Sequence, residues 1–294
     1  MLAKIDLKMV KREIIIFIRE FHHKTGENGI IIGLSGGIDS TLVAYLLKEA
    51  IGNENIYSYH FVSSTTPKED TIHARLVAKL LDIEYKEIAI DSIYDEFLNL
   101  VNSSENEITK DFKNNSNNKI SGVFENKSIN ELNTNNKNKS SEGNFKARIR
   151  MSLLYYFANL KNSIVAGTTN KSELLIGYFT KYGDGASDFE PIADIYKTQL
   201  KKLAILLNIP KEIINKPPRA GLWENQTDEE EIGFTYETLD QLLYLINDKK
   251  LNNEEILNKM DISKSEIDIV REKIISNEHK LHFPPRPFED KKLF

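Results

Sequence analysis

The residues best suited to chemistry lie between Ile31 and Thr41, where an apolar run meets the string Ser-Gly-Gly-Ile-Asp-Ser. Two consecutive glycines let the backbone turn sharply and approach an anion closely, because no Cβ stands in the way. The helical pattern at residues 41–50 would aim its positive end and several N–H groups at the same spot. The pattern therefore predicts a buried strand, a phosphate-binding loop and a helix. The alternative is a plain Gly-Gly turn in which Ser35 or Asp39 caps the helix.

Asp39 lies within this string and indicates that a cation takes part. A carboxylate beside bound phosphates would repel them unless Mg²⁺ lies between the two, so we expect Mg²⁺ as the cofactor. The string resembles the pyrophosphate loop of the ATP pyrophosphatase group, whose members cleave ATP between its α and β phosphates and adenylate a substrate. Neither a Walker A loop nor a Gly-x-Gly-x-x-Gly pattern is present. Nucleotidyl transfer is therefore favoured over γ-phosphate transfer.

Composition limits the class of protein. With 294 residues and 40% apolar content, the chain can bury one large α/β core, alone or with a small appendage. The net charge of −5 and the pI of 5.8 argue against a nucleic-acid surface, which is normally basic. No apolar run approaches the roughly 20 residues that cross a bilayer and no signal-peptide pattern is seen, so we expect a cytoplasmic protein without a membrane partner. The absence of cysteine excludes disulfides, Cys-zinc sites and thiol nucleophiles.

Apolar strand-like runs alternate with amphipathic helical patterns along the chain. We expect strands near residues 30–34, 56–62, 85–90 and 163–166. A helix is predicted from Pro67 to Leu81, with Thr66 as its N-cap. The predicted apolar face of this helix comprises Ile72, Leu76, Val77 and Leu80. Further helical patterns cover 146–160 and 235–277. The alternation is typical of an α/β fold, a doubly wound parallel sheet with helices on both faces, followed here by a helical C-terminal part.

The pattern stops between Val101 and Gly143, where Asn, Ser, Lys and Glu dominate and Phe112 and Phe124 are the only aromatic residues. Such a segment buries too little apolar surface to offset the entropy of ordering it. We expect a low-complexity, flexible insertion at 101–143 within an otherwise single domain. An active-site lid is the alternative.

A second polar region, Gly167–Pro191, follows the predicted strand at 163–166. Its small polar residues, glycines and mixed charges suit a ligand loop better than a core. Because sites in open α/β sheets lie beyond the carboxyl ends of the strands, we expect this region and the Ser35 loop to share one crevice. Upstream, Arg148 and Arg150 lie two positions apart and so point to different sides of a helix. One would bind ligand while the other pairs with a structural carboxylate.

Taken together, these strings resemble the NH₃-dependent NAD synthetases. The resemblance covers the chain except for the insertion, and it includes the strings Ala220–Glu229 and His279-Lys280. It implies a homodimer with a Rossmann-like or flavodoxin-like sheet and one synthetase domain over residues 1–294. It also implies ATP-dependent amidation of nicotinic acid adenine dinucleotide (deamido-NAD) to NAD. The nicotinate carboxylate attacks the α-phosphorus of ATP, pyrophosphate leaves, and ammonia then displaces AMP from the adenylated acyl group.

The resemblance also implies roles for individual residues. The implied ATP contacts are Gly33, Leu34, Ser35, Gly36, Gly37, Ile38, Asp39, Ser40, Thr168, Lys197 and Arg219. The implied deamido-NAD contacts are Arg148, Lys181, Asp188, His279 and Lys280. Asp39 and Glu173 would be the Mg²⁺ ligands. Lys197 would stabilise charge on the phosphate under attack, and Asp184 would help to admit ammonium and take its proton. Arg219 stands where the family usually has Ser or Thr, although an arginine could still reach a phosphate.

Each of these assignments has a structural alternative. Glu173 could merely complement a helix dipole. Lys181 and Lys197 could be solvated surface lysines, and Asp184 and Asp188, on either side of a glycine, could be turn formers. Two further expectations concern packing and capping. Trp223 is expected in packing or at a dimer interface, and the acidic run 228–231 is expected to cap the helix that begins near Thr235.

Other functions remain as alternatives. Among proteins with this loop, tRNA sulfur transferases need a cysteine and tRNA lysidine synthetases need a basic RNA surface, and neither is present. GMP and asparagine synthetases usually carry or recruit a Cys-dependent glutaminase. Without cysteine this chain cannot hydrolyse glutamine in that way, so we expect ammonia that is either free or passed from a glutaminase partner in trans. The non-enzymatic alternative is an adenine-nucleotide sensor of the universal-stress type.

Overall fold

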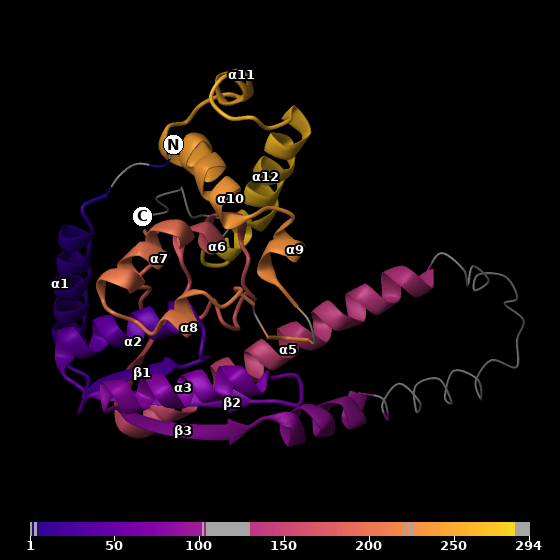
Figure 1. The fold of residues 1–294 in the computed structure, drawn as a ribbon. Coiled ribbons are helices and arrows are strands. Elements are labelled where there is room, and N and C mark those ends of the chain that lie inside the picture. Colours follow the sequence, from indigo (N-terminus) through magenta and orange to yellow (C-terminus); the bar gives the residue numbers. More distant parts are fainter. Residues whose placement is uncertain are drawn as a thin grey trace, which may run out of the picture.

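A four-stranded parallel sheet forms the centre of the fold (Figure 1). The computed structural model describes residues 2, 5–101, 103, 130–219, 221–223 and 226–285. The strands are β1 (Gly29–Gly33), β2 (Ile56–Val62), β3 (Glu84–Ala89) and β4 (Ser163–Ala166). All four predicted strands are confirmed, with shifts of one residue at β1 and β3. The predicted α/β fold is confirmed as well.

The strand order β3-β2-β1-β4 creates a switch point in the topology. The chain moves outward from β1 through β2 to β3 and then returns to place β4 on the other side of β1. Ile32 near the end of β1 pairs in register with Ala166 at the end of β4. Crevices that bind ligands form at such points, beyond the carboxyl ends of the strands. The loops that follow β1 and β4 therefore begin side by side.

Helices cover both faces of this sheet. The helices that precede or connect the strands are α1 (Leu7–Thr25), α2 (Ile38–Ile51), α3 (Lys68–Leu81) and α5 (Asn130–Lys161). Those after β4 are α6 (Lys171–Ile176), α7 (Lys197–Leu206), α8 (Lys211–Ile214), α9 (Asp228–Ile232), α10 (Tyr236–Leu243), α11 (Asn253–Leu257) and α12 (Lys264–Asn277). A π-helical turn, η1 (Tyr244–Asp248), extends α10, and a short 3₁₀ helix, η2 (Glu278–Lys280), follows α12. Residues 91–101 are also helical.

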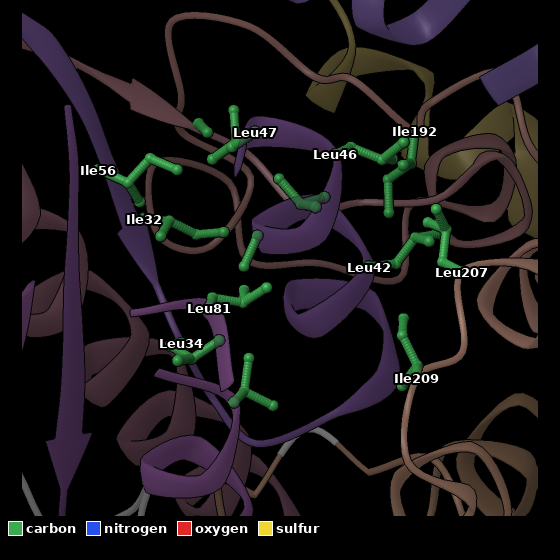
Figure 2. Close-up of a cluster of buried hydrophobic side chains, with 14 of the residues drawn as sticks. Ile32, Leu34, Leu42, Leu46, Leu47, Ile56, Leu81, Ile192, Leu207 and Ile209 are labelled. Atoms are coloured by element: carbon green, nitrogen blue, oxygen red, sulfur yellow. The ribbon is translucent and has the colours of Figure 1, made fainter. Parts of the chain in front are cut away.

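Alternation along β1 divides the core into two layers, because successive side chains of a strand point to opposite faces. Ile30 and Ile32 pack with α1, α2, α3 and α7 on one face, whereas Ile31 packs with α5 and the helix at 91–101 on the other. Figure 2 shows the first layer, in which Ile32 lies near Leu47 and Ile56. A third cluster joins α6, α10 and α12 (Figure 1). The helical C-terminal part is thus packed on α6, next to the region that follows β4.

Helix α3 packs with a different face from the one predicted. Ile72 and Leu80 are 59% and 51% exposed, so the predicted apolar face is wrong for these two residues, whereas Val77 is buried as predicted and Leu76 is half-buried. The buried residues are Asp70, His73, Ala74, Val77, Ala78 and Leu81. Two polar side chains turn inward because they meet a buried lysine, as described below. The predicted cap is also wrong, since Pro67 occupies the N-cap position and the Thr66 hydroxyl accepts the N–H of Ser63 at 2.9 Å.

Helix α5 begins earlier than the sequence predicts. The predicted helix at 146–160 is confirmed, but α5 starts at Asn130, inside the segment expected to be an insertion. Residues 104–129, which make up most of that segment, lie outside the described residues. Gly143 packs against Leu222 and Trp223, where a Cβ would lie 3.1 Å from the indole ring. The predicted helical region 235–277 is divided into α10, η1, α11 and α12. None of the helices described is long and apolar enough to cross a membrane.

Candidate active site

The loop between β1 and α2 has the geometry of an anion site. Gly36 has a φ of +80°, and a Cβ added there would lie 2.1 Å from the Asp70 carbonyl oxygen, so only glycine fits. The N–H of Ser35 donates to Ser40 Oγ at 3.2 Å, and the N–H of Gly37 donates to Ser35 Oγ at 3.2 Å. Gly37 is the N-cap residue of α2 and makes no side-chain cap. The alternative that Ser35 or Asp39 is the N-cap is therefore wrong, and the first N–H groups of α2 have no such partner.

A buried lysine joins two carboxylates at the start of α2, α6 and α7. The Lys197 side chain is 1% exposed, and its Nζ donates to Asp39 Oδ2 at 2.6 Å and to Glu173 Oε1 at 3.2 Å. Asn170 Nδ2 donates to Asp39 Oδ1 at 2.9 Å. Asn170 and Glu173 also form the capping box of α6. Glu173 therefore has a local role at the start of α6, and the same carboxylate also binds Lys197. Lys197 itself is buried and is not a surface lysine.

Lys197 forms ion pairs with Asp39 and Glu173 and also interacts electrostatically with a third carboxylate, that of Asp228. The hydroxyls of Tyr178 and Tyr236 donate to its two carboxylate oxygens at 3.2 and 3.4 Å. Burial raises the pKa of Glu173 to about 8, although Lys197 opposes the shift, and burial raises the pKa of Asp228 to about 6. Burial lowers the pKa of Lys197, but Asp39 and Glu173 outweigh it, so the net shift is upward. We call Asp39, Glu173, Lys197 and Asp228 the carboxylate cluster; it carries more negative than positive charge.

These groups face one cavity of about 270 Å³ at the switch point of the sheet. The predicted residues that line it are Gly33, Leu34, Ser35, Gly37, Ile38, Asp39, Ser40, Thr168, Glu173, Asp184, Lys197 and Arg219. Tyr59, Phe61 and Leu154 supply an apolar part of the wall. The prediction that the two polar regions share one crevice is confirmed. Among the described residues, no group of three or more His, Asp and Glu side chains has the arrangement of a metal site.

A second cavity, of about 540 Å³, adjoins the first through Tyr178, Asp184 and Leu222, which line both. Lys280 lines it and donates to the carbonyl oxygens of Gly177 and Phe179 at 2.6 and 3.0 Å. Asp184 Oδ1 accepts the N–H of Thr180 at 2.9 Å, so the turn-forming role weighed for Asp184 is present as well. A role in the turn alone does not explain why Asp184 lies where the two cavities meet.

The other predicted dinucleotide contacts line neither of these two cavities. Lys181 Nζ donates to the His279 carbonyl oxygen at 2.6 Å, and Arg148 Nη2 donates to the Lys181 carbonyl oxygen at 3.2 Å. Asp188 accepts the N–H of Val165 at 2.7 Å and so fixes the end of β4. Arg148, Lys181 and His279 therefore form one group joined by hydrogen bonds at the surface.

Among the residues of the first cavity that sequence reasoning missed are Arg150, Asp228 and Lys216. Arg150, rather than Arg148, lines it, and the guanidinium makes no hydrogen bond with the described residues. Burial lowers the Arg150 pKa against the opposing charge of Asp184. The spacing of Ala147, Arg150 and Leu154 on α5 could have indicated this face, because residues three and four apart align on a helix.

The other two missed residues, Asp228 and Lys216, follow α8 along the chain and had no clear signal. Asp228 begins α9 and joins the carboxylate cluster, whereas the run 228–231 was expected only to cap the next helix. That capping prediction holds for one residue, since Glu229 Oε1 accepts the N–H of Tyr236 at 2.9 Å. Lys216 also lines the cavity. Neither position has a sequence pattern that distinguishes it from a surface charge.

The fold and this site together define an α/β nucleotide-binding protein with an anion-binding loop at the switch point of its sheet. The family model for NAD synthase matches residues 10–284, and the chain belongs to the NAD synthase family. It is 41% identical over 282 residues to the NH₃-dependent NAD⁺ synthetase of Methanocaldococcus jannaschii, covering 96% of this chain and 97% of that protein.

Two solved structures are also similar over almost the whole chain. The NH₃-dependent NAD synthetase of Campylobacter jejuni, in complex with the nitrate ion, matches with a TM-score of 0.70 and 32% identity, covering 96% of this chain and 99% of that chain. The NMN synthetase of Francisella tularensis matches with a TM-score of 0.75 and 28% identity, covering 97% of this chain and 99% of that chain. The membership makes this chain an amide-forming ligase.

Proposed function

We propose that this chain converts deamido-NAD to NAD with ATP and ammonia, releasing AMP and pyrophosphate. The observation that carries the proposal is that the Ser35–Ser40 loop and Lys197, with its partners Asp39 and Glu173, line one cavity. The chain that contains this cavity belongs to the NAD synthase family. The first N–H groups of α2, which have no side-chain cap, suit a polyphosphate, and a buried ammonium suits the charge that develops on a phosphate under attack.

In the first step, a nicotinate carboxylate oxygen attacks the α-phosphorus of ATP and the bond to the β-phosphate oxygen breaks. The loop residues 33–40, Thr168 and Arg219 hold the phosphates. Lys197 shares its charge with the equatorial oxygens of the reacting phosphate, because its Nζ lies between Asp39 and Glu173 at the cavity wall. A cation fixed in advance stabilises the transition state without reorganisation during the reaction.

Two members of the carboxylate cluster, Asp39 and Glu173, suit a Mg²⁺ ion that accompanies ATP and takes its other ligands from the phosphates. Asp39 and Glu173 form ion pairs with a single ammonium, Asp228 adds a further carboxylate nearby, and the pKa values of Glu173 and Asp228 are both raised. Asp39 and Glu173 would hold the ion with phosphate oxygens as further ligands, which is how Mg²⁺ is commonly bound. When bound, the ion would neutralise charge on the triphosphate.

In the second step, ammonia attacks the acyl carbon and AMP leaves with the electron pair of the C–O bond. Asp184 stands where the two cavities meet, which is a suitable place to bind ammonium and take its proton. Ammonia, rather than glutamine, is the nitrogen donor of this chain, because it has no cysteine to attack glutamine. A glutaminase in another chain could deliver the ammonia.

The remaining parts of the proposal concern the dinucleotide and the assembly. The surface group Arg148, Lys181 and His279, together with Asp188 and Lys280, would bind deamido-NAD. We propose a homodimer, supported by exposed apolar side chains of α5 such as Leu160, which is 64% exposed. We also propose one domain over residues 1–294 with an insertion at 101–143, and a cytoplasmic location, where ATP is available.

The function is tested by following NAD and pyrophosphate with purified protein, ATP, Mg²⁺, deamido-NAD and either ammonium or glutamine. We expect both products with ammonium and neither with glutamine. Pyrophosphate without NAD would reject the amidation step, and no product at all would favour a nucleotide sensor. Because an NMN synthetase is among the similar structures, the mononucleotide nicotinic acid substrate is run in parallel; faster turnover of it would reassign the substrate.

A further inference from the structure

A second buried ion cluster contacts the Ser35–Ser40 loop through its backbone. The Lys216 side chain is only 6% exposed. Its Nζ donates to the Gly36 carbonyl oxygen at 2.6 Å and to Asp70 Oδ1 at 2.7 Å, and it lies 3.3 Å from His73 Nδ1. One ammonium group therefore joins the segment after α8, the first two turns of α3 and the loop. This contact also explains why α3 turns two polar residues inward.

We infer that Lys216 is a positioning residue for the loop, which it holds in the conformation that receives ATP phosphates. The peptide unit between Gly36 and Gly37 is held at both ends, since Lys216 binds its carbonyl oxygen and Ser35 Oγ accepts its N–H. A peptide unit is planar, with its C=O and N–H on opposite sides, so this pair of contacts fixes its orientation. The inference rests on the proposed function, because the phosphates belong to the ATP of that reaction.

The loop needs such a contact because glycine restricts the backbone less than any other residue does. Gly36 has a φ of +80° and packs against the Asp70 carbonyl oxygen. A side chain that would restrict the backbone therefore does not fit at this position. Lys216 supplies the missing restraint from outside the loop. With the Gly36–Gly37 unit fixed, the first N–H groups of α2, which have no partner within the helix, keep their direction toward the cavity.

The charges around Lys216 favour a geometric role over simple attraction of phosphate. Arg219 Nη2 donates to Asp70 Oδ1 and to Glu69 Oε2, both at 2.9 Å. Two cations therefore face two carboxylates, and burial and the Lys216 charge both lower the pKa of His73, which favours its neutral form. A balanced cluster adds little net positive field, whereas its short, buried contacts determine where the Gly36 carbonyl points.

The test compares Lys216→Met and Lys216→Arg with Lys211→Met, an exposed lysine on the neighbouring α8. The probe is α,β-methylene-ATP with Mg²⁺, titrated by calorimetry into the full chain without a second substrate. For Lys216→Met we expect a rise of about tenfold in the Kd of the probe and in the KM for ATP, or about 1.4 kcal/mol. The KM for ammonium should change less than about twofold, and Lys211→Met should match the wild type. Lys216→Arg should stay impaired, because a guanidinium keeps the charge but not the compact contact.

Three results would overturn the inference. Unchanged probe binding by Lys216→Met would show that Lys216 does not position the loop. Wild-type probe binding by Lys216→Arg would show that the positive charge alone explains the effect. Equal rises in every KM together with a lower Tm would indicate general structural damage. If Lys216→Met does not fold, Lys216→Gln, which keeps one donor, replaces it with the same expected direction. A wild-type chain that binds the probe but forms no NAD would reject the proposed function, and probe binding by the variants would then decide the role of Lys216.

Discussion

Removal of the Lys197 ammonium is the sharpest perturbation of the site, because it leaves the partly buried carboxylates of Asp39 and Glu173 and the buried carboxylate of Asp228 without their cation. In Lys197→Met, Asp39 and Glu173 lose donors at 2.6 and 3.2 Å. Removing one partner of a buried ion pair typically costs about 3–5 kcal/mol. We expect a loss of that size at pH 8.5, together with a fall in NAD formation of several orders of magnitude.

The stability loss should depend on pH in a defined direction. The pKa of Glu173 is already raised to about 8 and that of Asp228 to about 6, and both rise further without Lys197. A carboxyl group with a raised pKa binds more protons in the folded state, so the free energy of unfolding falls as pH rises between the unfolded and folded pKa values. The loss in Lys197→Met should therefore be small near pH 5.5, where protonation relieves the repulsion, and should grow toward pH 8.5.

Urea denaturation at pH 5.5 and 8.5, without nucleotide or metal, measures this difference. Lys202→Met, an exposed position on the same helix, is the matched control and should show no pH-dependent loss relative to the wild type. The double variant Lys197→Met with Glu173→Gln should recover part of the stability at pH 8.5, because one of the unpaired charges is gone. A loss that is equal at both pH values, or a double variant no better than the single, would refute the reasoning.

Three further outcomes are expected. Asp39→Asn should keep its melting temperature within a few degrees but reduce turnover by orders of magnitude, because an amide is a poor Mg²⁺ ligand; near-normal NAD formation would reject the metal role. Arg150→Met should raise the KM of ATP or deamido-NAD about tenfold or more, since a hydrogen bond to a charged group contributes about 1.5–3 kcal/mol; unchanged values for both would show that the guanidinium contacts neither substrate. Gly36→Ala should abolish binding of α,β-methylene-ATP and lower Tm, because its Cβ would lie 2.1 Å from the Asp70 carbonyl oxygen; wild-type binding would mean that the loop relaxes freely.

The sequence alone determined the features that depend on neighbours along the chain. The strand before Ser35, the glycine turn and the helix after it are local signals, since hydrophobic runs, φ preferences and helix ends act within a few residues. The alternation of such units indicated a parallel sheet, and the strand ends then indicated which loops meet in a crevice. The absence of cysteine restricted the nitrogen donor without any structure.

Only the tertiary structure decided which charged side chains face the cavity. Arg148 and Arg150 are equivalent in sequence, and the packing of α5 on the sheet selects Arg150. Asp228 and Lys216 look like surface charges until α9 and the segment after α8 fold back onto residues 50 and 146 positions away along the chain. The inward face of helix α3 differs from the predicted one for the same reason, because this face is set by the ion cluster that it meets. Periodicity records which side chains are apolar, whereas long-range pairing of charges determines which polar groups can be buried.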